Sequence, residues 1–139
     1  MNDFTGMYDI RLATDKDNNF ILATFLRGLY YGDSWFSQIP KEIFMANYKA
    51  VGEALLSPNK TTIKIACLKE DPSVILGYSI LSKDETTIIW LYVKSVWRNK
   101  GIAKSLVPKE LKAVTHLTKL GQTLLSKYPG AIFNPFWTP

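Results

Sequence analysis

Hydrophobic and polar positions at the start of the chain predict a strand followed by a helix. Residues 9–13 have the pattern of an extended segment, and Thr14 or Asp15 can cap a helix from about Asp17 to Tyr30. This helix carries one apolar stripe, made of Phe20, Ala23, Leu26 and Tyr30. Residues 31–34 have the composition of a loop.

A second helix is predicted to begin near Pro40, because proline is tolerated in the first turn of a helix. The turn-forming sequence at residues 57–59 should end it. The apolar positions of this helix are Ile43, Phe44, Tyr48, Val51 and Leu55.

After residue 60 the pattern changes from helical to extended. Strands are predicted over Thr62–Leu68, Val74–Leu81 and Thr86–Val93, with turn sequences at residues 70–72 and 83–85 between them. The third strand is apolar on both faces, which predicts a central strand that is covered on both sides.

The pattern beyond Val93 begins with a basic loop at residues 94–100. A helix is predicted to start at Gly101, and Pro108 should break or restart it. Three segments remain, namely Val114–Leu117 as a short strand or the middle of a helix, Leu120–Lys127 as a helix, and Ala131–Phe133 as an extended segment.

The composition predicts one globular domain over residues 1–139, with 47% hydrophobic and 13% aromatic residues to build its core. No stretch has the pattern of a membrane span or a secretory signal, so we expect a cytoplasmic protein with no membrane partner. A single cysteine, Cys67, excludes an intrachain disulfide framework. With a single histidine, His116, as well, no metal site is expected.

The net charge of +5 comes from one segment. Between Lys94 and Lys112, Glu110 is the only acidic residue among six basic ones, and the rest of the chain is neutral. A local positive field attracts an anionic ligand or a nucleic acid. A solvated helix face rich in lysine is the alternative interpretation.

Within this segment, residues 98–103 match the pattern Arg/Gln-x-x-Gly-x-Gly/Ala. They follow the predicted central strand, which ends Trp90-Leu91-Tyr92-Val93, after four residues, and they stand at a helix start. This arrangement resembles the acetyl-coenzyme A (acetyl-CoA) loop of the GCN5-related N-acetyltransferase (GNAT) superfamily. The upstream order of one strand, two helices and three strands is similar to that superfamily as well.

The resemblance implies an α/β (α+β) fold, in which helices flank a mixed, mostly antiparallel central sheet that is splayed at the acetyl-CoA loop. Pyrophosphate needs several backbone N–H groups aimed at one point, as a helix N-terminus provides. Gly101 lacks a Cβ and lets the backbone approach the phosphate, while backbone N–H groups at the strand end suit the thioester oxygen. With acetyl-CoA as cosubstrate, the expected binding residues are Leu91, Tyr92, Val93, Arg98, Asn99, Lys100, Gly101, Ile102, Ala103 and Lys104.

Two other phosphate-binding motifs do not fit. Lys104-Ser105 has the ending of a Walker-type loop, but both glycines that should precede it are absent. The three spaced glycines of a dinucleotide-binding fold are absent too.

The implied reaction moves an acetyl group from acetyl-CoA to an amine of an unidentified small-molecule or protein acceptor. A base must remove a proton from the amine, and an acid must protonate the leaving thiolate. Superfamily members often carry an acidic base on the central strand and a tyrosine on the last helix, where this sequence has Leu125. The nearest candidates are Glu85, otherwise a turn residue, and Tyr128, otherwise a packing residue. His116 is a further candidate base, although a lone histidine is more often structural or exposed.

The resemblance also places the acceptor pocket between the first two helices and the C-terminal strands. An aromatic lining suits a bulky or apolar acceptor or a protein partner, and the rim of the core is the alternative role for these residues. The candidates are Tyr30, Tyr31, Trp35 and Phe36, with Phe136 and Trp137 as possible additions.

Short motifs at residues 25–29, 39–41 and 91–94 are similar to small acetyltransferase-like proteins of bacteriophages, which implies the cytoplasm of an infected host. Two other functions stay open. One is a structural or interaction protein that has the fold without the chemistry, because the usual catalytic residues are missing. The other is a small nucleic-acid binder that uses the basic segment, which the neutral remainder of the chain argues against.

Overall fold

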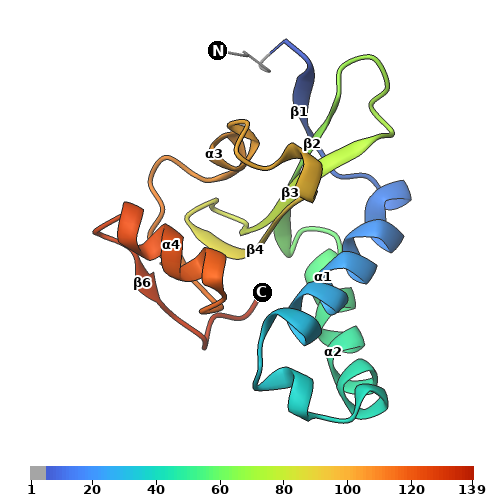
Figure 1. The fold of residues 1–139 in the computed structure, drawn as a ribbon, viewed down its shortest axis with the longest axis vertical. Helices are drawn as coiled ribbons and strands as arrows, with labels where there is room; N and C mark the ends of the chain where they lie inside the picture. The colour runs from blue at the N-terminus through green and yellow to red at the C-terminus, as the bar shows by residue number, and fades with distance from the viewer. Residues whose placement is uncertain (1–5) are drawn as a thin grey trace.

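A computed structural model of the protein describes residues 6–139 and has a six-stranded sheet at its centre (Figure 1). The strands lie side by side in chain order. Neighbours from β1 to β4 are antiparallel, whereas β5 is parallel to both β4 and β6. The strands are β1 (Tyr8–Leu12), β2 (Thr61–Leu68), β3 (Ile75–Ser82), β4 (Thr87–Val93), β5 (Ala113–Val114) and β6 (Ile132–Phe133). The mixed, mostly antiparallel sheet expected from the sequence is confirmed.

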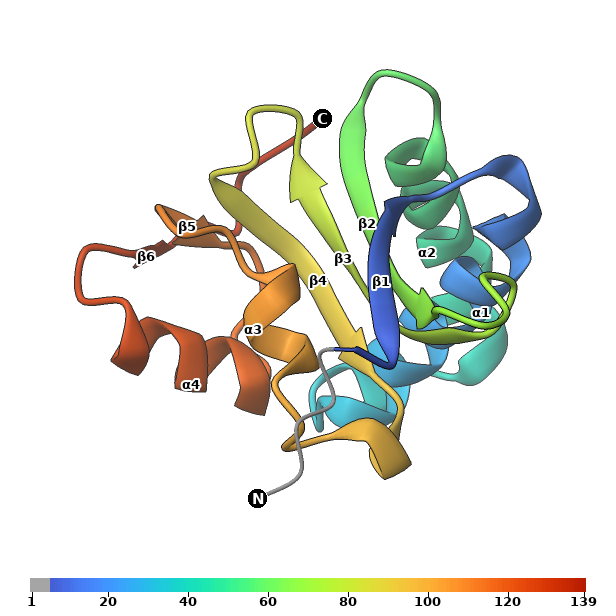
Figure 2. The same ribbon diagram turned by 90° about the horizontal axis from the view of Figure 1, so that it is seen from above.

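Helices cover both faces of the sheet, as Figure 2 shows. One face carries α1 (Asn18–Gly32) and α2 (Lys41–Leu56), and the other carries α3 (Ile102–Leu106) and α4 (Lys119–Lys127). No helix within residues 6–139 combines the length and the apolar character needed to cross a bilayer. Single 3-10 turns lie at Asp15–Asp17, Phe36–Gln38 and Ser95–Trp97.

Strand β4 separates two hydrophobic cores because its side chains alternate between the faces of the sheet. Trp90 packs among the residues of α1 and α2, whereas Leu91 and Val93 pack with α3. Every β4 residue except Tyr92 is buried. The prediction of a central strand covered on both sides is therefore confirmed.

The apolar stripe predicted for the first helix is wrong in detail. Ala23 is exposed, and the most deeply buried positions of α1 are Ile21, Phe25 and Leu29. The sequence of α1 is apolar nearly all round, so its pattern does not select one stripe. Packing on the sheet decides which face of α1 is buried, because Phe25 packs edge-to-face on Trp90 with ring centroids 5.3 Å apart.

The segments after residue 100 form short helices and strands. Helix α3 ends at Leu106, two residues before Pro108, as expected from the steric restriction that proline imposes on the preceding residue. The ambiguous segment at residues 114–117 contributes to a strand, because the backbone of Val114 pairs with Ile88 of β4. The predicted helix and the final extended segment correspond to α4 and β6.

An ion pair fixes the connection between β1 and α1. Arg11 donates two hydrogen bonds to the carboxylate of Asp17, at 2.8 and 2.9 Å, and two more to the carbonyl oxygen of Pro72 in the β2–β3 turn. The backbone N–H of Thr14 also donates to Asp17. The hydrogen bonds from Arg11, more than any other contact, lower the pKa of Asp17 below its usual value.

Replacing the carboxylate of Asp17 should change the free energy of unfolding by an amount that depends on pH. Asp17→Asn should lower the free energy of unfolding at pH 7 by about 2 kcal/mol, the usual range for a hydrogen bond to a charged group. Because the pKa of Asp17 is lowered on folding, its contribution is complete above the unfolded-state pKa near 4 and is lost as the pH falls below it. Urea denaturation from pH 7 to pH 2 should show the two proteins converging in acid. A constant difference across this range would contradict the assignment.

Candidate active site

Strands β4 and β5 touch only at their first residues and then separate. Their parallel pairing consists of Thr87 with Ala113 and Ile88 with Val114, extended by a hydrogen bond from the Thr115 N–H to the Ile88 carbonyl. Beyond this point the chain turns away into α4, as Figure 2 shows. The rest of β4 has no neighbouring strand on this side among residues 6–139.

A β-bulge marks the point of separation. Opposite β3, Ile80 pairs with Trp90 and Leu81 pairs with Ile88, so Ile89 is the extra residue. The carbonyl oxygen of Ile89 lies 3.3 Å from the hydroxyl of Thr115 and 3.0 Å from Nδ1 of His116. The bulge therefore turns this carbonyl toward the residues that follow β5.

The open edge of β4 presents unpaired backbone N–H groups. Lys94 donates its N–H to Leu76 of β3, and amide directions alternate along a strand, so the N–H groups of Leu91 and Val93 point away from β3. No acceptor among the described residues bonds either group. The Val93 carbonyl points the same way and accepts a hydrogen bond from Nε of Arg98 at 3.0 Å.

The basic loop after β4 has an unusual backbone at two positions. Asn99 has φ 61° and Gly101, the N-cap of α3, has φ 84°, which only glycine adopts at low cost. A Cβ at Gly101 would meet no atom within 4 Å, so the space beside this glycine is open.

The loop also has the chemistry of an anion site. The first N–H groups of a helix have no partner within the helix, which leaves those of residues 102–104 as donors. Arg98 and Lys104 are exposed, and neither forms an ion pair with a carboxylate in the described part of the chain. Unpaired amides, a left-handed glycine and two cations without a carboxylate partner in the described part of the chain together fit the pyrophosphate of acetyl-CoA.

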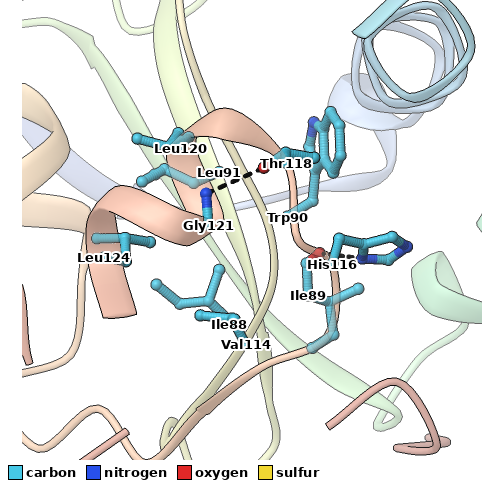
Figure 3. Close-up of a pocket in the computed structure, with 10 residues that line it drawn as sticks. All are labelled: Ile88, Ile89, Trp90, Leu91, Val114, His116, Thr118, Leu120, Gly121 and Leu124. Carbon is cyan, nitrogen blue, oxygen red and sulfur yellow. Dashed lines mark hydrogen bonds between the residues drawn. The ribbon is translucent and has the colours of Figure 1, made fainter. Parts of the chain in front are cut away.

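A small pocket of about 20 Å³ lies between β4 and the N-terminal part of α4 (Figure 3). Thr118 caps α4 by accepting a hydrogen bond from the Gly121 N–H at 3.0 Å. The side chains of Leu120 and Leu124 face those of Ile88 and Leu91 across the cavity. This side of the open β4 edge is therefore apolar.

Solved structures of other proteins have a similar fold. No protein-family model matches the sequence, and the search of curated proteins also finds no match. A proposed acetyl transferase from Pyrococcus furiosus superposes with a TM-score of 0.59 and 17% identity, over 95% of this chain and 85% of that one. A predicted acetyltransferase from Clostridium acetobutylicum, whose structure contains acetyl-CoA, gives 0.55 and 17%, over 96% and 95% of the two chains. The GCN5-related N-acetyltransferase from Rhodopseudomonas palustris gives 0.50 and 22%, over 72% and 61%.

The chain has the GNAT acetyltransferase fold. The superpositions on the proteins from Pyrococcus furiosus and Clostridium acetobutylicum cover 95% and 96% of this chain. They therefore include both the antiparallel half of the sheet and the diverging strands β4 and β5. The fold class expected from the sequence is thereby confirmed.

Within the GNAT fold, the two candidate catalytic residues lie apart. Glu85 sits in the β3–β4 turn, where its carboxylate lies 2.6 Å from Nζ of Lys64. It is at the opposite end of β4 from the basic loop, roughly 25 Å away along the strand. Tyr128 ends α4 and packs, half-buried, against the core beneath α3 and α4. The structure brings neither residue to the bulge at Ile89.

The aromatic residues predicted for the acceptor pocket divide into two groups. Tyr30 and Phe36 are buried in the core, where the hydroxyl of Tyr30 donates to the Ile39 carbonyl at 2.7 Å. Tyr31 and Trp35 are 62% and 66% exposed beside them. The core role, one of the two alternatives for these residues, therefore describes Tyr30 and Phe36.

The C-terminal aromatic candidates also differ from each other. Trp137 packs against the core beneath α1 and α2, whereas Phe136 is exposed. Trp137 thus brings the C-terminal segment to the face of the sheet that α1 and α2 cover.

Sequence reasoning missed Thr115 as a contact of the bulge and gave His116 no defined position. The signal available was slight, because the segment that holds both residues fitted either a strand or a helix. Their role depends on the Ile89 carbonyl, which is 26 residues away from Thr115 in the chain.

Gly121 sets how closely α4 approaches the chain that leaves β5. A Cβ at this position would overlap the carbonyl oxygen of His116, which belongs to the backbone and has little freedom to move. Gly121→Ala should therefore lower the free energy of unfolding by about 1–3 kcal/mol, as overpacking does.

Guanidinium denaturation of the purified variants measures this effect. Gly130→Ala is the matched control, because a Cβ at Gly130 meets nothing within 4 Å, and its effect should stay within about 0.5 kcal/mol. Equal stabilities of the two variants would contradict the close packing of α4.

Proposed function

We propose that residues 1–139 form one N-acetyltransferase domain, which moves an acetyl group from acetyl-CoA to an amine of a small molecule or protein. The observation that carries this proposal is the open edge of β4 next to the glycine-containing anion site. The GNAT fold supports the same reaction, and one similar structure contains acetyl-CoA.

Each part of the open edge has a role in this proposal. The N–H groups of residues 102–104 bind the pyrophosphate at Gly101, with Asn99 shaping the turn and Arg98, Lys100 and Lys104 adding positive charge. Ile102 is buried and anchors the loop to the core, and the small side chain of Ala103 leaves room for the phosphate.

Acetyl-CoA supplies an acetyl group activated as a thioester. The N–H groups of Leu91 and Val93 then act as donors to its carbonyl oxygen, which gains negative charge during the reaction. Tyr92, between them, faces α1 and contributes packing. The apolar cavity below β4 excludes water from the bond that breaks.

The acceptor site is proposed on the other face, beside Tyr31 and Trp35. Both rings are largely exposed and are therefore available to contact an acceptor. Glu85 and Tyr128 stay predictions as base and acid, and the phage origin and host cytoplasm stay predictions as well.

Calorimetry tests the binding of the cosubstrate. The protein should bind acetyl-CoA and coenzyme A with a dissociation constant on the order of 1 µM to 1 mM, the usual range for enzyme substrates. Gly101→Glu should weaken binding at least about tenfold, because it places a carboxylate where an anion binds and strains a left-handed backbone.

Gly130→Glu is the control for this experiment, since it adds the same charge at a glycine with open surroundings and should bind normally. Circular dichroism verifies that both variants are folded. No heat with either nucleotide would refute the proposal. Binding without transfer to any amine would favour the structural protein with this fold instead.

A further inference from the structure

His116 lies where β4 and β5 separate. Its Nδ1 is 3.0 Å from the carbonyl oxygen of the bulged residue Ile89 and 2.8 Å from the hydroxyl of Thr115. A carbonyl oxygen only accepts hydrogen bonds, so Nδ1 carries the hydrogen in this geometry. The other ring nitrogen, Nε2, is then the one with a free lone pair.

Aromatic rings hold this imidazole in place. Its ring is edge-to-face with Trp90 and with Phe25, at centroid distances of 5.9 and 6.4 Å. The side chain is only partly exposed, and Nε2 has no hydrogen-bond partner among residues 6–139. The orientation of the ring is therefore fixed while its basic nitrogen stays unused.

His116 belongs to the lining of the pocket, but its imidazole does not face the leucines of α4. Figure 3 shows the ring of His116 turned away from Leu120 and Leu124 and toward the side of Trp90. The open edge of β4 thus has an apolar side under α4 and a basic nitrogen on the side of α1. If acetyl-CoA and the acceptor amine reach this edge from opposite faces, only the face of α1 offers a basic nitrogen, Nε2 of His116.

Burial favours the uncharged form of this imidazole. Burial lowers the pKa of His116 below its usual value, and the hydrogen bond to the Ile89 carbonyl and, less strongly, the Asp33 carboxylate partly oppose this effect. The α1 and β4 residues that contact the ring, Phe25 and Trp90, carry no charge.

We propose that Nε2 of His116 is the general base that deprotonates the acceptor amine, an inference that rests on the proposed acetyl transfer. The ammonium gives one proton to Nε2, and the neutral nitrogen then forms the C–N bond to the acetyl carbon as the C–S bond breaks. The second proton leaves the nitrogen for the thiolate, which departs as a thiol. The imidazolium returns its proton to solvent.

His116→Asn separates this role from a structural one. The Asn Nδ2 takes the place of Nδ1 and keeps the hydrogen bond to Ile89, but the side chain has no equivalent of Nε2. Thiol release from acetyl-CoA, with 2-phenylethylamine as the acceptor, should fall about 100-fold in kcat, the low end for general bases. Calorimetric binding of coenzyme A should be unchanged.

The pH profile gives a second kinetic readout. In the unmodified protein, kcat should fall as the pH drops through the pKa of His116, because the protonated ring accepts no proton. His116→Asn should lack this limb. Retention of kcat within about threefold by the variant would overturn the proposal.

NMR provides a test without turnover. His116 is the only histidine, so labelled imidazole gives one set of signals, which should report the Nδ1–H form with a pKa below 6.5. Coenzyme A should shift these signals. If coenzyme A binds by calorimetry and the signals do not move, the role of His116 is refuted while the proposed function stands. If coenzyme A does not bind, the proposed function itself fails.

Discussion

Strand β4 pairs with β3 from Ile88 to Val93, with a bulge at Ile89, but pairs with β5 only at its first two residues. This constraint determines the rest of the site, because backbone N–H groups that lose a strand neighbour need water or a ligand as partner. The bulge at Ile89 makes the separation possible without breaking the ladder to β3. Thr115 and His116 then satisfy the carbonyl that the bulge turns outward.

The two hydrophobic cores hold β4 in position, so that the gap between β4 and β5 neither closes nor widens. On one face, Phe25 and Trp90 fix β4 against α1, and on the other, Leu91 packs with Ile102 and Leu106 of α3. Dense packing on both faces leaves β4 little freedom to shift toward β5. The open edge is consequently a rigid feature, which the proposed acetyl transfer would require to position the reacting bond.

The prediction succeeded where local pattern and local chemistry agree. The bounds of β1 to β4 and of α1 and α2 follow from the period of apolar residues and from turn sequences, and they differ from the structure by one or two residues. The loop at Gly101 was found because a left-handed glycine at a helix start leaves a short motif in the sequence. The stripe of α1 and the ion pair of Glu85 with Lys64 were not found, because each depends on which neighbours the fold brings near.

The sequence by itself determined the order of elements, the buried central strand and the basic loop with its glycine. Each of these depends on residues that are close together in the chain, where backbone sterics and hydrophobic period act directly. Only the tertiary structure decided that β4 and β5 diverge after two pairs and that His116 faces the Ile89 carbonyl. These features depend on packing between segments some 25 residues apart, and a bulge is a property of the pairing between strands, which no single segment encodes.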